Sequence, residues 1–382
     1  MEHEISKKKR VLVALSGGVD SSVSAALLRE EGYEVEGAFI VTWTAPWLPC
    51  TWREERMDAM RVAAHLHIPF HTIDLSKEYE REVVDYMVRE YREGRTPNPD
   101  VMCNKYIKFG GLFDWAMKQG FEYVATGHYA RVERCQENKE VTESHVAPCN
   151  LKHETCKLLC GIDAGKDQSY FLWTLTQRHL THTLFPVGRF EKPYVRELAK
   201  KFDLPTAQKK DSQGVCFLGK IDMKEFLQHY ISPQEGAVLD TDGRIIGTHD
   251  GAMFVTLGQR HGFEVTAHSS DTPPQYVVAK DIEHNTVTVA PHAVEEGRGV
   301  QSIYLDAVNW IGDVPPVTCM ARLRYRQPLF SMILKEVSNT TATAVLDIPQ
   351  DYVPVGQSLV IYDGDECCGG GVISGVYNGD TL

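Results

Sequence analysis

The sequence has no long apolar run. Its first apolar stretch, Val11–Leu15, is five residues long, which is too short for a signal peptide and far too short to cross a membrane. We find no internal repeat and no low-complexity tract. The ten cysteines are spaced irregularly, unlike the disulfide framework of a secreted protein. We therefore expect a cytoplasmic protein with reduced thiols and no membrane partner.

Positive charge is also scarce. The chain carries 40 lysines and arginines against 52 aspartates and glutamates, a formal charge of −12. This balance argues against a protein that coats nucleic acid without selection, although it leaves local basic patches open. With 43% hydrophobic and 24% charged residues, the composition is that of a globular protein. A length of 382 residues predicts two or three domains.

Strand-like and helix-like segments alternate in the first third of the chain, which predicts an α/β fold with a parallel sheet. The polar segment 133–157 is expected to be an excursion such as a long hairpin, and short alternating runs after Pro233 predict β structure. We predict a nucleotide-binding domain over 1–163, a helical adaptor over 164–232, a small β domain over 233–300 and a β-barrel over 301–382. The expected strands are 11–15, 35–41, 71–75 and 123–126, and the expected helices are 21–31, 53–66, 79–91 and 109–119.

A glycine-rich loop, Ser16–Ser22, joins the first strand to the first helix. Two glycines allow a tight turn that brings backbone N–H groups close to an anion, and the helix start adds its positive dipole end. The loop is neither a Walker loop nor a dinucleotide fingerprint, because it lacks both Gly-Lys-Ser/Thr and G-x-G-x-x-G. It could be a turn without a ligand. It resembles the loop of the ATP pyrophosphatase (PP-loop) superfamily, whose members cleave ATP between the α and β phosphates to adenylate a substrate.

Two cysteines lie in segments of unusual composition. Thr96–Asn104 contains two prolines, which predict a rigid non-helical loop, and Asp100 is close enough to Cys103 to move protons near its thiol. Cys216 lies between glycines and follows Lys209 and Lys210, which favour a thiolate. Either cysteine taken alone could be an inert buried thiol.

Taken together and in this order, the motifs resemble those of the tRNA-specific 2-thiouridylases. The resemblance runs nearly end to end and departs mainly in 133–157, which are longer here, and in the tryptophan-rich stretch 42–52. The matching segments are Ser16–Ser21, Thr96–Asn104, Ala125–Tyr129, Lys166–Phe171, Gly214–Phe217, Thr256–Arg260, Arg324–Gln327 and Gly369–Gly371.

The resemblance implies a reaction. AMP would be transferred from ATP, with Mg²⁺, to the C2 oxygen of the wobble uridine in tRNA, and sulfur would then replace that oxygen. Cys216 would carry the persulfide sulfur and Cys103 would be its partner. Either Cys103 releases sulfide from the persulfide or it resolves a direct attack, and both routes leave a transient Cys103–Cys216 disulfide. A relay protein or a cysteine desulfurase would supply the sulfur, and a monomer is the default expectation.

The resemblance also implies site residues. Asn98, Pro99 and Asp100 would line the pocket for the target base, and Asp100 would act as general acid or base. The expected ATP-binding residues are Ala14, Leu15, Ser16, Gly17, Gly18, Val19, Asp20, Ser21, Ile40 and Gly127. The expected tRNA contacts are His128, Lys166, Asp167, Gln168, Arg324, Tyr325 and Gln357.

Some of these residues have simpler interpretations. His128 could be a structural histidine, and Asp167 could cap a solvated helix start. Arg322, Arg324 and Arg326 alternate, which predicts that they share one face of a strand and bind phosphate.

The sequence leaves three alternatives open, one for a metal site and two for the function. Cys149, His153, Cys156 and Cys160 fall within twelve residues and could hold zinc, although their spacing is unusual and we predict no metal. Another PP-loop ligase, such as an amidating enzyme, would share the fold without needing the two cysteines. A non-catalytic tRNA-binding protein could use ATP only to change shape.

Overall fold

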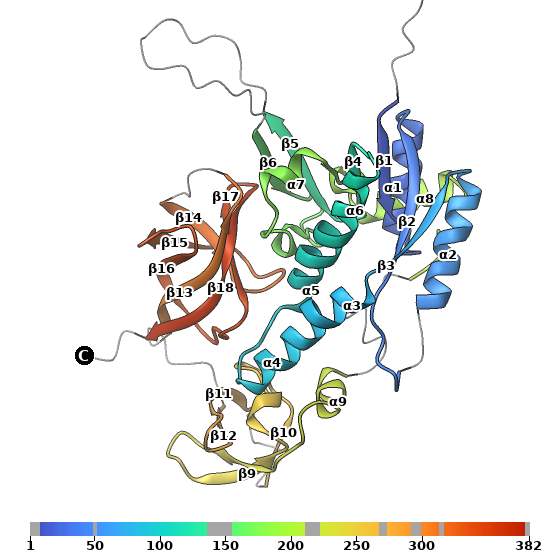
Figure 1. The fold of residues 1–382 in the computed structure, drawn as a ribbon. Helices are drawn as coiled ribbons and strands as arrows, with labels where there is room; N and C mark the ends of the chain where they lie inside the picture. Colours follow the sequence, from blue (N-terminus) through green and yellow to red (C-terminus); the bar gives the residue numbers. More distant parts are fainter. Residues whose placement is uncertain are drawn as a thin grey trace, which may run out of the picture.

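The computed structural model describes residues 8–48, 52–135, 155–210, 222–266, 273–291, 299–312 and 317–378. These residues form three β-sheets. In Figure 1 the parallel sheet, the small yellow β domain and the orange-red barrel surround a central run of helices. The predicted α/β domain followed by β-rich and barrel domains is confirmed.

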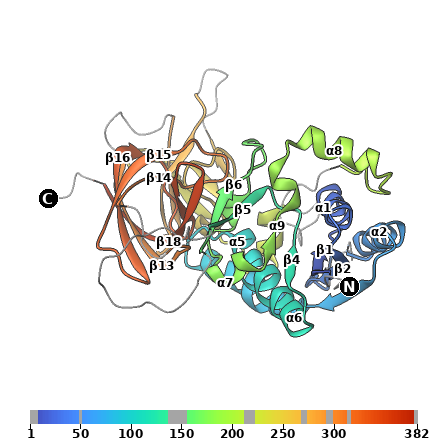
Figure 2. The same ribbon diagram turned by 90° about the horizontal axis from the view of Figure 1, so that it is seen from above.

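The first sheet is parallel and has the order β3-β2-β1-β4-β7. Its central strand β1 is continuously apolar and is covered on both faces. Val11 and Val13 face the cluster that contains α1, α2 and α8, whereas Leu12 faces the helices of residues 76–118. Seen from above, α1 and α8 lie on one side of the sheet and α6 on the other (Figure 2). The bounds are β1 (Arg10–Ala14), α1 (Val19–Glu30), β2 (Glu34–Val41), α2 (Trp52–His65), β3 (Phe70–Asp74), β4 (Tyr123–Ala125), β7 (Thr183–Leu184) and α8 (Lys192–Lys201).

Two helical runs cover the second face of this sheet. The predicted helix 79–91 is confirmed as part of the first run, α3 (Ser76–Tyr79), η1 (Glu80–Asp85) and α4 (Tyr86–Arg92). The second run comprises α5 (Pro99–Met102), η2 (Cys103–Leu112) and α6 (Phe113–Lys118), and both η segments are π-helical.

The predicted non-helical loop over Thr96–Asn104 is wrong beyond Asn98, because the helix begins at Pro99 and includes Cys103. The local chemistry explains the difference. The Asn98 side chain caps the helix by accepting a hydrogen bond from the N–H of Val101 at 3.3 Å. Pro99 occupies the first helical position, where its missing N–H costs nothing and its fixed φ is favourable.

The excursion begins and ends as a hairpin of β5 (Ala130–Cys135) and β6 (Thr155–Cys160), while residues 136–154 lie outside the described residues. Strand β6 also pairs with β18 of the barrel. In the predicted adaptor region, β7 pairs with β4 of the first sheet. Its other elements are η3 (Ser169–Phe171), α7 (Gln177–Thr181), η4 (Pro186–Arg189) and α9 (Met223–Gln228).

The remaining residues form the two predicted β units. The central sheet has the order β10-β9-β8-β12-β11, and a pairing between β13 and β18 closes the C-terminal strands into a barrel. The central elements are β8 (Gly236–Leu239), β9 (Ile245–His249), η5 (Ala252–Phe254), β10 (Phe263–Val265), β11 (Tyr276–Asp281) and β12 (Thr286–Ala290). The barrel strands are β13 (Val300–Trp310), β14 (Thr318–Arg322), β15 (Phe330–Lys335), β16 (Thr341–Gln350), β17 (Ser358–Asp363) and β18 (Glu366–Asn378).

The prediction that three arginines share one strand face is wrong. Strand β14 ends at Arg322, and the chain then turns, with Arg326 in the left-handed region at φ 64°. The Arg322 guanidinium packs over the Tyr362 ring at 4.7 Å and lies 3.5 Å from the carboxylate of Asp167. A buried carboxylate therefore balances this charge without an external phosphate.

Within the described residues, we find no helix with the length and apolar character needed to cross a membrane.

Candidate functional site

The glycine-rich loop follows β1 and turns directly into α1. Gly17 adopts a left-handed conformation at φ 73°, and Gly18 is the residue before the helix, which starts at Val19. The Ser21 hydroxyl fixes the loop by accepting a hydrogen bond from the N–H of Ser16 at 3.2 Å and donating one to the carbonyl of Gly18 at 3.2 Å. The first N–H groups of a helix lack partners within the helix and attract anions. This loop therefore forms a cradle suited to a pyrophosphate group.

The neighbouring strands bring further residues to the same edge. A Cβ on Gly127, just after β4, would lie 2.7 Å from the amide nitrogen of Ser21 and 2.9 Å from the carbonyl carbon of Asp20. Ile40 lies near the carboxyl end of β2, which pairs with β1. The structure thus gathers the expected nucleotide residues at the carboxyl edge of the sheet, where open α/β sheets bind ligands. Their contact with ATP stays a prediction.

The carboxylate of Asp20 is held by two residues that were not among the expected nucleotide-binding residues. Its oxygens lie 2.7 and 2.8 Å from Nζ of Lys192, and the Tyr129 hydroxyl donates to it at 2.9 Å. Lys192, at the start of α8, is only 8% exposed. No local pattern could link Lys192 to a residue 172 positions away.

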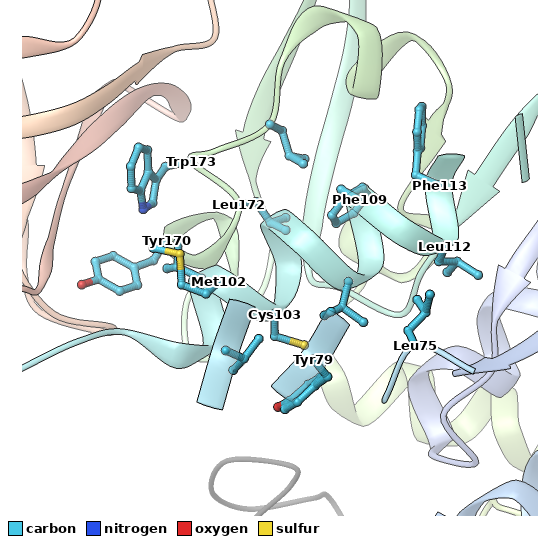
Figure 3. Close-up of a cluster of buried hydrophobic side chains, with 14 of the residues drawn as sticks. Leu75, Tyr79, Met102, Cys103, Phe109, Leu112, Phe113, Tyr170, Leu172 and Trp173 are labelled. Atoms are coloured by element: carbon cyan, nitrogen blue, oxygen red, sulfur yellow. The ribbon is translucent and has the colours of Figure 1, made fainter. Parts of the chain in front are cut away.

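The expected base pocket lies at the start of the second helical run. Asn98 is 8% exposed, and Asp100 is half-buried. Burial raises the pKa of Asp100, and the positive charge of Lys108 opposes that rise. Cys103 is 6% exposed and lies among buried side chains that include Tyr79 (Figure 3). Asp100 and Cys103 thus lie on one helical run rather than on a loop.

The barrel reaches this segment through Gln357. The Gln357 side chain donates to the carbonyl of Pro97 at 3.0 Å and accepts from the Asn98 amide at 3.5 Å. Beside it, the N–H of Thr96 donates to the carbonyl of Val355 at 2.8 Å. The amide of Gln357, expected to contact tRNA, therefore holds the base-pocket segment in this structure.

Two other expected tRNA contacts have buried side chains. His128 is 7% exposed, with Nδ1 at 2.7 Å from the Thr126 hydroxyl and Nε2 at 3.3 Å from Nζ of Lys108. Burial and the charge of Lys108 hold the pKa of His128 well below its usual range, so the ring is neutral. Asp167 is 3% exposed and accepts hydrogen bonds from Gly161 and Ser169. Both side chains lie inside the protein here.

Three other expected tRNA contacts, Lys166, Gln168 and Arg324, have side chains that are not fully buried. The carbonyl of the Gln168 side chain accepts from the N–H of Tyr129 at 3.0 Å, and Lys166 is half-buried nearby in the chain. On the barrel turn, Arg324 donates to the carbonyl of Tyr352 at 2.9 Å and lies 3.4 Å from that of Leu257 in the central domain.

The barrel turn is also connected to the Cys103 helix. The Tyr325 ring packs on Phe171 with ring centroids 4.8 Å apart. The carbonyl of Phe171 in turn accepts a hydrogen bond from the Asn104 amide at 3.2 Å. Since Asn104 follows Cys103 directly in the chain, these contacts connect the turn to the residue next to Cys103.

Several predictions fall outside the described residues. Cys216 belongs to 211–221, so its pairing with Cys103 stays a prediction, and so does the role of Cys149 and His153. The thiols of Cys156 and Cys160 lie 3.9 and 3.5 Å from the hydroxyls of Thr181 and Ser169. Burial raises the pKa of Cys160 to about 11. Across the residues that the structure describes, no group of three or more His, Cys, Asp or Glu side chains could hold a metal.

Three family models match successive parts of the chain. They are described as a tRNA methyl transferase HUP domain over residues 9–220, a tRNA methyl transferase PRC-barrel domain over 224–291 and an aminomethyltransferase beta-barrel domain over 300–373. The first covers more than half of the chain.

Curated relatives match over almost the whole length. The tRNA-specific 2-thiouridylase MnmA of Geobacillus thermodenitrificans is 43% identical over 98% of this chain and 97% of its own length. The enzyme of the same name from Streptococcus mutans is 42% identical over 98% of both chains. Among solved structures, the U34-tRNA thiolase NcsA from Methanococcus maripaludis aligns at 16% identity with a TM-score of 0.34, covering 60% of this chain and 70% of that one. On the strength of the full-length sequence matches, the chain belongs to the tRNA-specific 2-thiouridylase family.

Proposed function

We propose that this protein is a tRNA-uridine 2-sulfurtransferase, which uses ATP to replace the C2 oxygen of the wobble uridine with sulfur. The observation that carries the proposal is the 43% identity to a 2-thiouridylase over 98% of the chain. The geometry supports it, because a pyrophosphate cradle lies in the same domain as a buried cysteine and a half-buried carboxylate.

The first half-reaction activates a poor leaving group. The uridine C2 oxygen bonds to the α-phosphorus of ATP while the bond to the bridging oxygen breaks, and pyrophosphate leaves with that electron pair. The cradle formed by Ser16–Ser21 would hold the phosphates, with Mg²⁺ accompanying the ATP. Asp100 would accept the proton that leaves N3 of the base, since its raised pKa makes it a stronger base than an exposed aspartate.

The second half-reaction replaces AMP with sulfur. In one route, Cys103 attacks the persulfide on Cys216 and releases hydrosulfide, which displaces AMP from C2. In the other, the terminal persulfide sulfur displaces AMP directly, and Cys103 then attacks the Cys216 sulfur to free the thiouridine. Both routes end in a Cys103–Cys216 disulfide, which a thiol reductant must reduce before the next turnover.

The partners and location belong to the same proposal. The substrate is tRNA bound through its anticodon region, with the target base turned out of its stack into the pocket formed by Asn98–Asp100. A relay protein or a cysteine desulfurase would load Cys216. We propose a monomer in the cytoplasm, a location supported by the free thiols of all six cysteines for which the structure gives a state.

The test reconstitutes the reaction from purified protein. An unmodified tRNA transcript with a wobble uridine is incubated with ATP, Mg²⁺, a persulfide-generating desulfurase and reductant. We expect 2-thiouridine, AMP and pyrophosphate in equal amounts, measured by nucleoside mass spectrometry and nucleotide chromatography. C103S and C216S should release pyrophosphate and accumulate adenylated tRNA without 2-thiouridine, whereas C368S, which alters a half-buried thiol on β18, should behave like wild type.

Two outcomes would overturn the proposal. One is a wild-type protein that binds tRNA and ATP but forms neither AMP nor 2-thiouridine, as expected of an ATP-switched binding protein. The other is full thiolation by C103S or C216S, since no sulfur-transfer route described above survives the loss of either thiol.

A further inference from the structure

Lys108 is a half-buried cation with an unusual partner. It lies on η2, five residues after Cys103, and its Nζ is 3.3 Å from Nε2 of His128. An ammonium can only donate, so Nε2 accepts and the ring donates its other proton from Nδ1 to the Thr126 hydroxyl. Among the residues that the structure describes, no carboxylate forms an ion pair with Lys108. The direct partner of its charge is therefore a neutral ring, and Asp100 interacts with it only through longer-range electrostatics.

The surroundings of Lys108 place that charge between two parts of the site. On one side, His128 follows Gly127, where an added Cβ would lie 2.7 Å from the amide nitrogen of Ser21 in the phosphate loop. On the other side, the charge acts on Asp100 at the base pocket. The bond that forms during adenylation joins a nucleotide phosphate to a base oxygen, so it must lie between these two parts.

Lys192 differs from Lys108 in the group that holds its ammonium. Lys192 also reaches the phosphate loop, but both carboxylate oxygens of Asp20 lie within 2.8 Å of its ammonium. A cation already paired with a carboxylate offers less to an incoming phosphate than one paired only with an imidazole. Burying an ammonium that has no anion in direct contact costs free energy. Charged groups buried at such a cost occur often at sites that bind a ligand of opposite charge.

We propose that Lys108 is a catalytic residue of the adenylation step and that its ammonium binds the α-phosphoryl oxygens of ATP. This inference rests on the proposed function. As the C2 oxygen bonds to the α-phosphorus and pyrophosphate departs, negative charge gathers on the equatorial oxygens of that phosphorus. The Lys108 ammonium stabilises this charge. Neutral His128 holds the ammonium in place and, unlike a carboxylate, has no negative charge that would compete with the phosphoryl oxygens.

The experiment measures pyrophosphate release, the product of adenylation, in a single turnover with tRNA and saturating ATP. K108Q should lower the rate about 100-fold, the usual effect of losing one preorganised donor to a transition state. K108R keeps the charge and should recover part of the rate. The matched control is K118Q, an exposed lysine at the end of the same helical run. The dissociation constant for tRNA, measured by filter binding, should change less than threefold in all three variants.

Each outcome decides a separate question. If wild type releases no pyrophosphate with tRNA, the proposed function fails before Lys108 is tested. If wild type is active and K108Q keeps its rate, or loses only tRNA affinity, the inference about Lys108 is overturned. A structural role would lower the melting temperature of K108Q and leave the rate per folded molecule unchanged, which would also overturn it. Should K108Q fail to fold, the same measurement on K108M, which keeps the aliphatic stem, decides.

Discussion

Replacing Gly127 by alanine should weaken ATP binding. The added Cβ would lie 2.7 Å from the amide nitrogen of Ser21 and 2.9 Å from the carbonyl carbon of Asp20. Both contacts are with backbone atoms of the loop and of the first turn of α1, so no side-chain rotation relieves them. The clash must move either the end of β4 or the phosphate loop itself.

The size of the effect follows from the overlap. An unstrained contact between a carbon and another heavy atom is about 3.5 Å, so the loop or strand must move by roughly 0.8 Å. Overpacking of this kind costs about 1–3 kcal/mol. If the cost falls on the cradle that must close around the phosphates, the dissociation constant for ATP rises between about 5- and 150-fold, since 1.4 kcal/mol corresponds to a factor of ten.

Isothermal titration with a non-hydrolysable ATP analogue measures this constant directly. G312A is the matched control, because a Cβ at Gly312 meets no atom within 4 Å. An unchanged ATP affinity in G127A, with a melting temperature lowered by the clash, would show that the cradle is not the nucleotide site. Equal losses of affinity in G127A and G312A would refute the geometric reasoning.

Three further predictions follow from the site. K192M removes the cation beside Asp20 and should lower kcat/KM for ATP at least tenfold in AMP formation, because the carboxylate then repels the phosphates; an unchanged value contradicts this role. Since burial raises the pKa of Asp100, folding binds its proton more tightly and wild-type stability falls as pH rises through that pKa. The melting temperature of D100N relative to wild type should therefore increase as the pH rises from the ordinary aspartate pKa of 3.8 through the raised pKa, and a constant difference over this range would contradict the shift. Q357A should lower tRNA-dependent AMP formation without changing ATP affinity, and equal loss of both would contradict a role at the base pocket.

The first sheet could be predicted because its strands carry their own signal. A continuously apolar strand such as Val11–Leu15, followed by glycines and an amphipathic helix, predicts a buried parallel strand and a loop at its carboxyl end. The observed strand and helix differ from the prediction by only one or two residues at their ends. The phosphate cradle is local in sequence, so its glycines and serines were identifiable together.

The Cys103 segment carries a local helix signal that its two prolines obscure. Two prolines suggested a loop, but Asn98 followed by Pro99 and Asp100 is the signature of a capped helix start. Proline disrupts a helix in its interior, whereas Pro99 occupies the first helical position. The alternating arginines predicted a shared strand face incorrectly, because the strand ends at Arg322 and a turn follows it.

The electrostatics of the site could not be predicted, because its pairs come from distant elements. Asp20 meets Lys192 across 172 positions, and Gln357 meets Pro97 across 260. The contact of Lys108 with His128 joins a helix to the end of a strand. Hydrophobic periodicity fixes which face of an element is buried, but it does not specify which polar groups meet above the sheet.

Thr96, two residues before the cap of the Asp100 helix, contacts both the barrel and the central domain. The Thr96 N–H bonds to the barrel at Val355, and its hydroxyl lies 3.3 Å from that of Thr256 in the central domain. Thr96 is 9% exposed, so an unpaired N–H there would cost about 1–3 kcal/mol. Gln357 adds a bond to Pro97, one residue before the helix cap. The segment that begins the helix of Asp100 and Cys103 is therefore fixed by contacts from outside its own domain, and the position of those two residues depends on all three units being folded together.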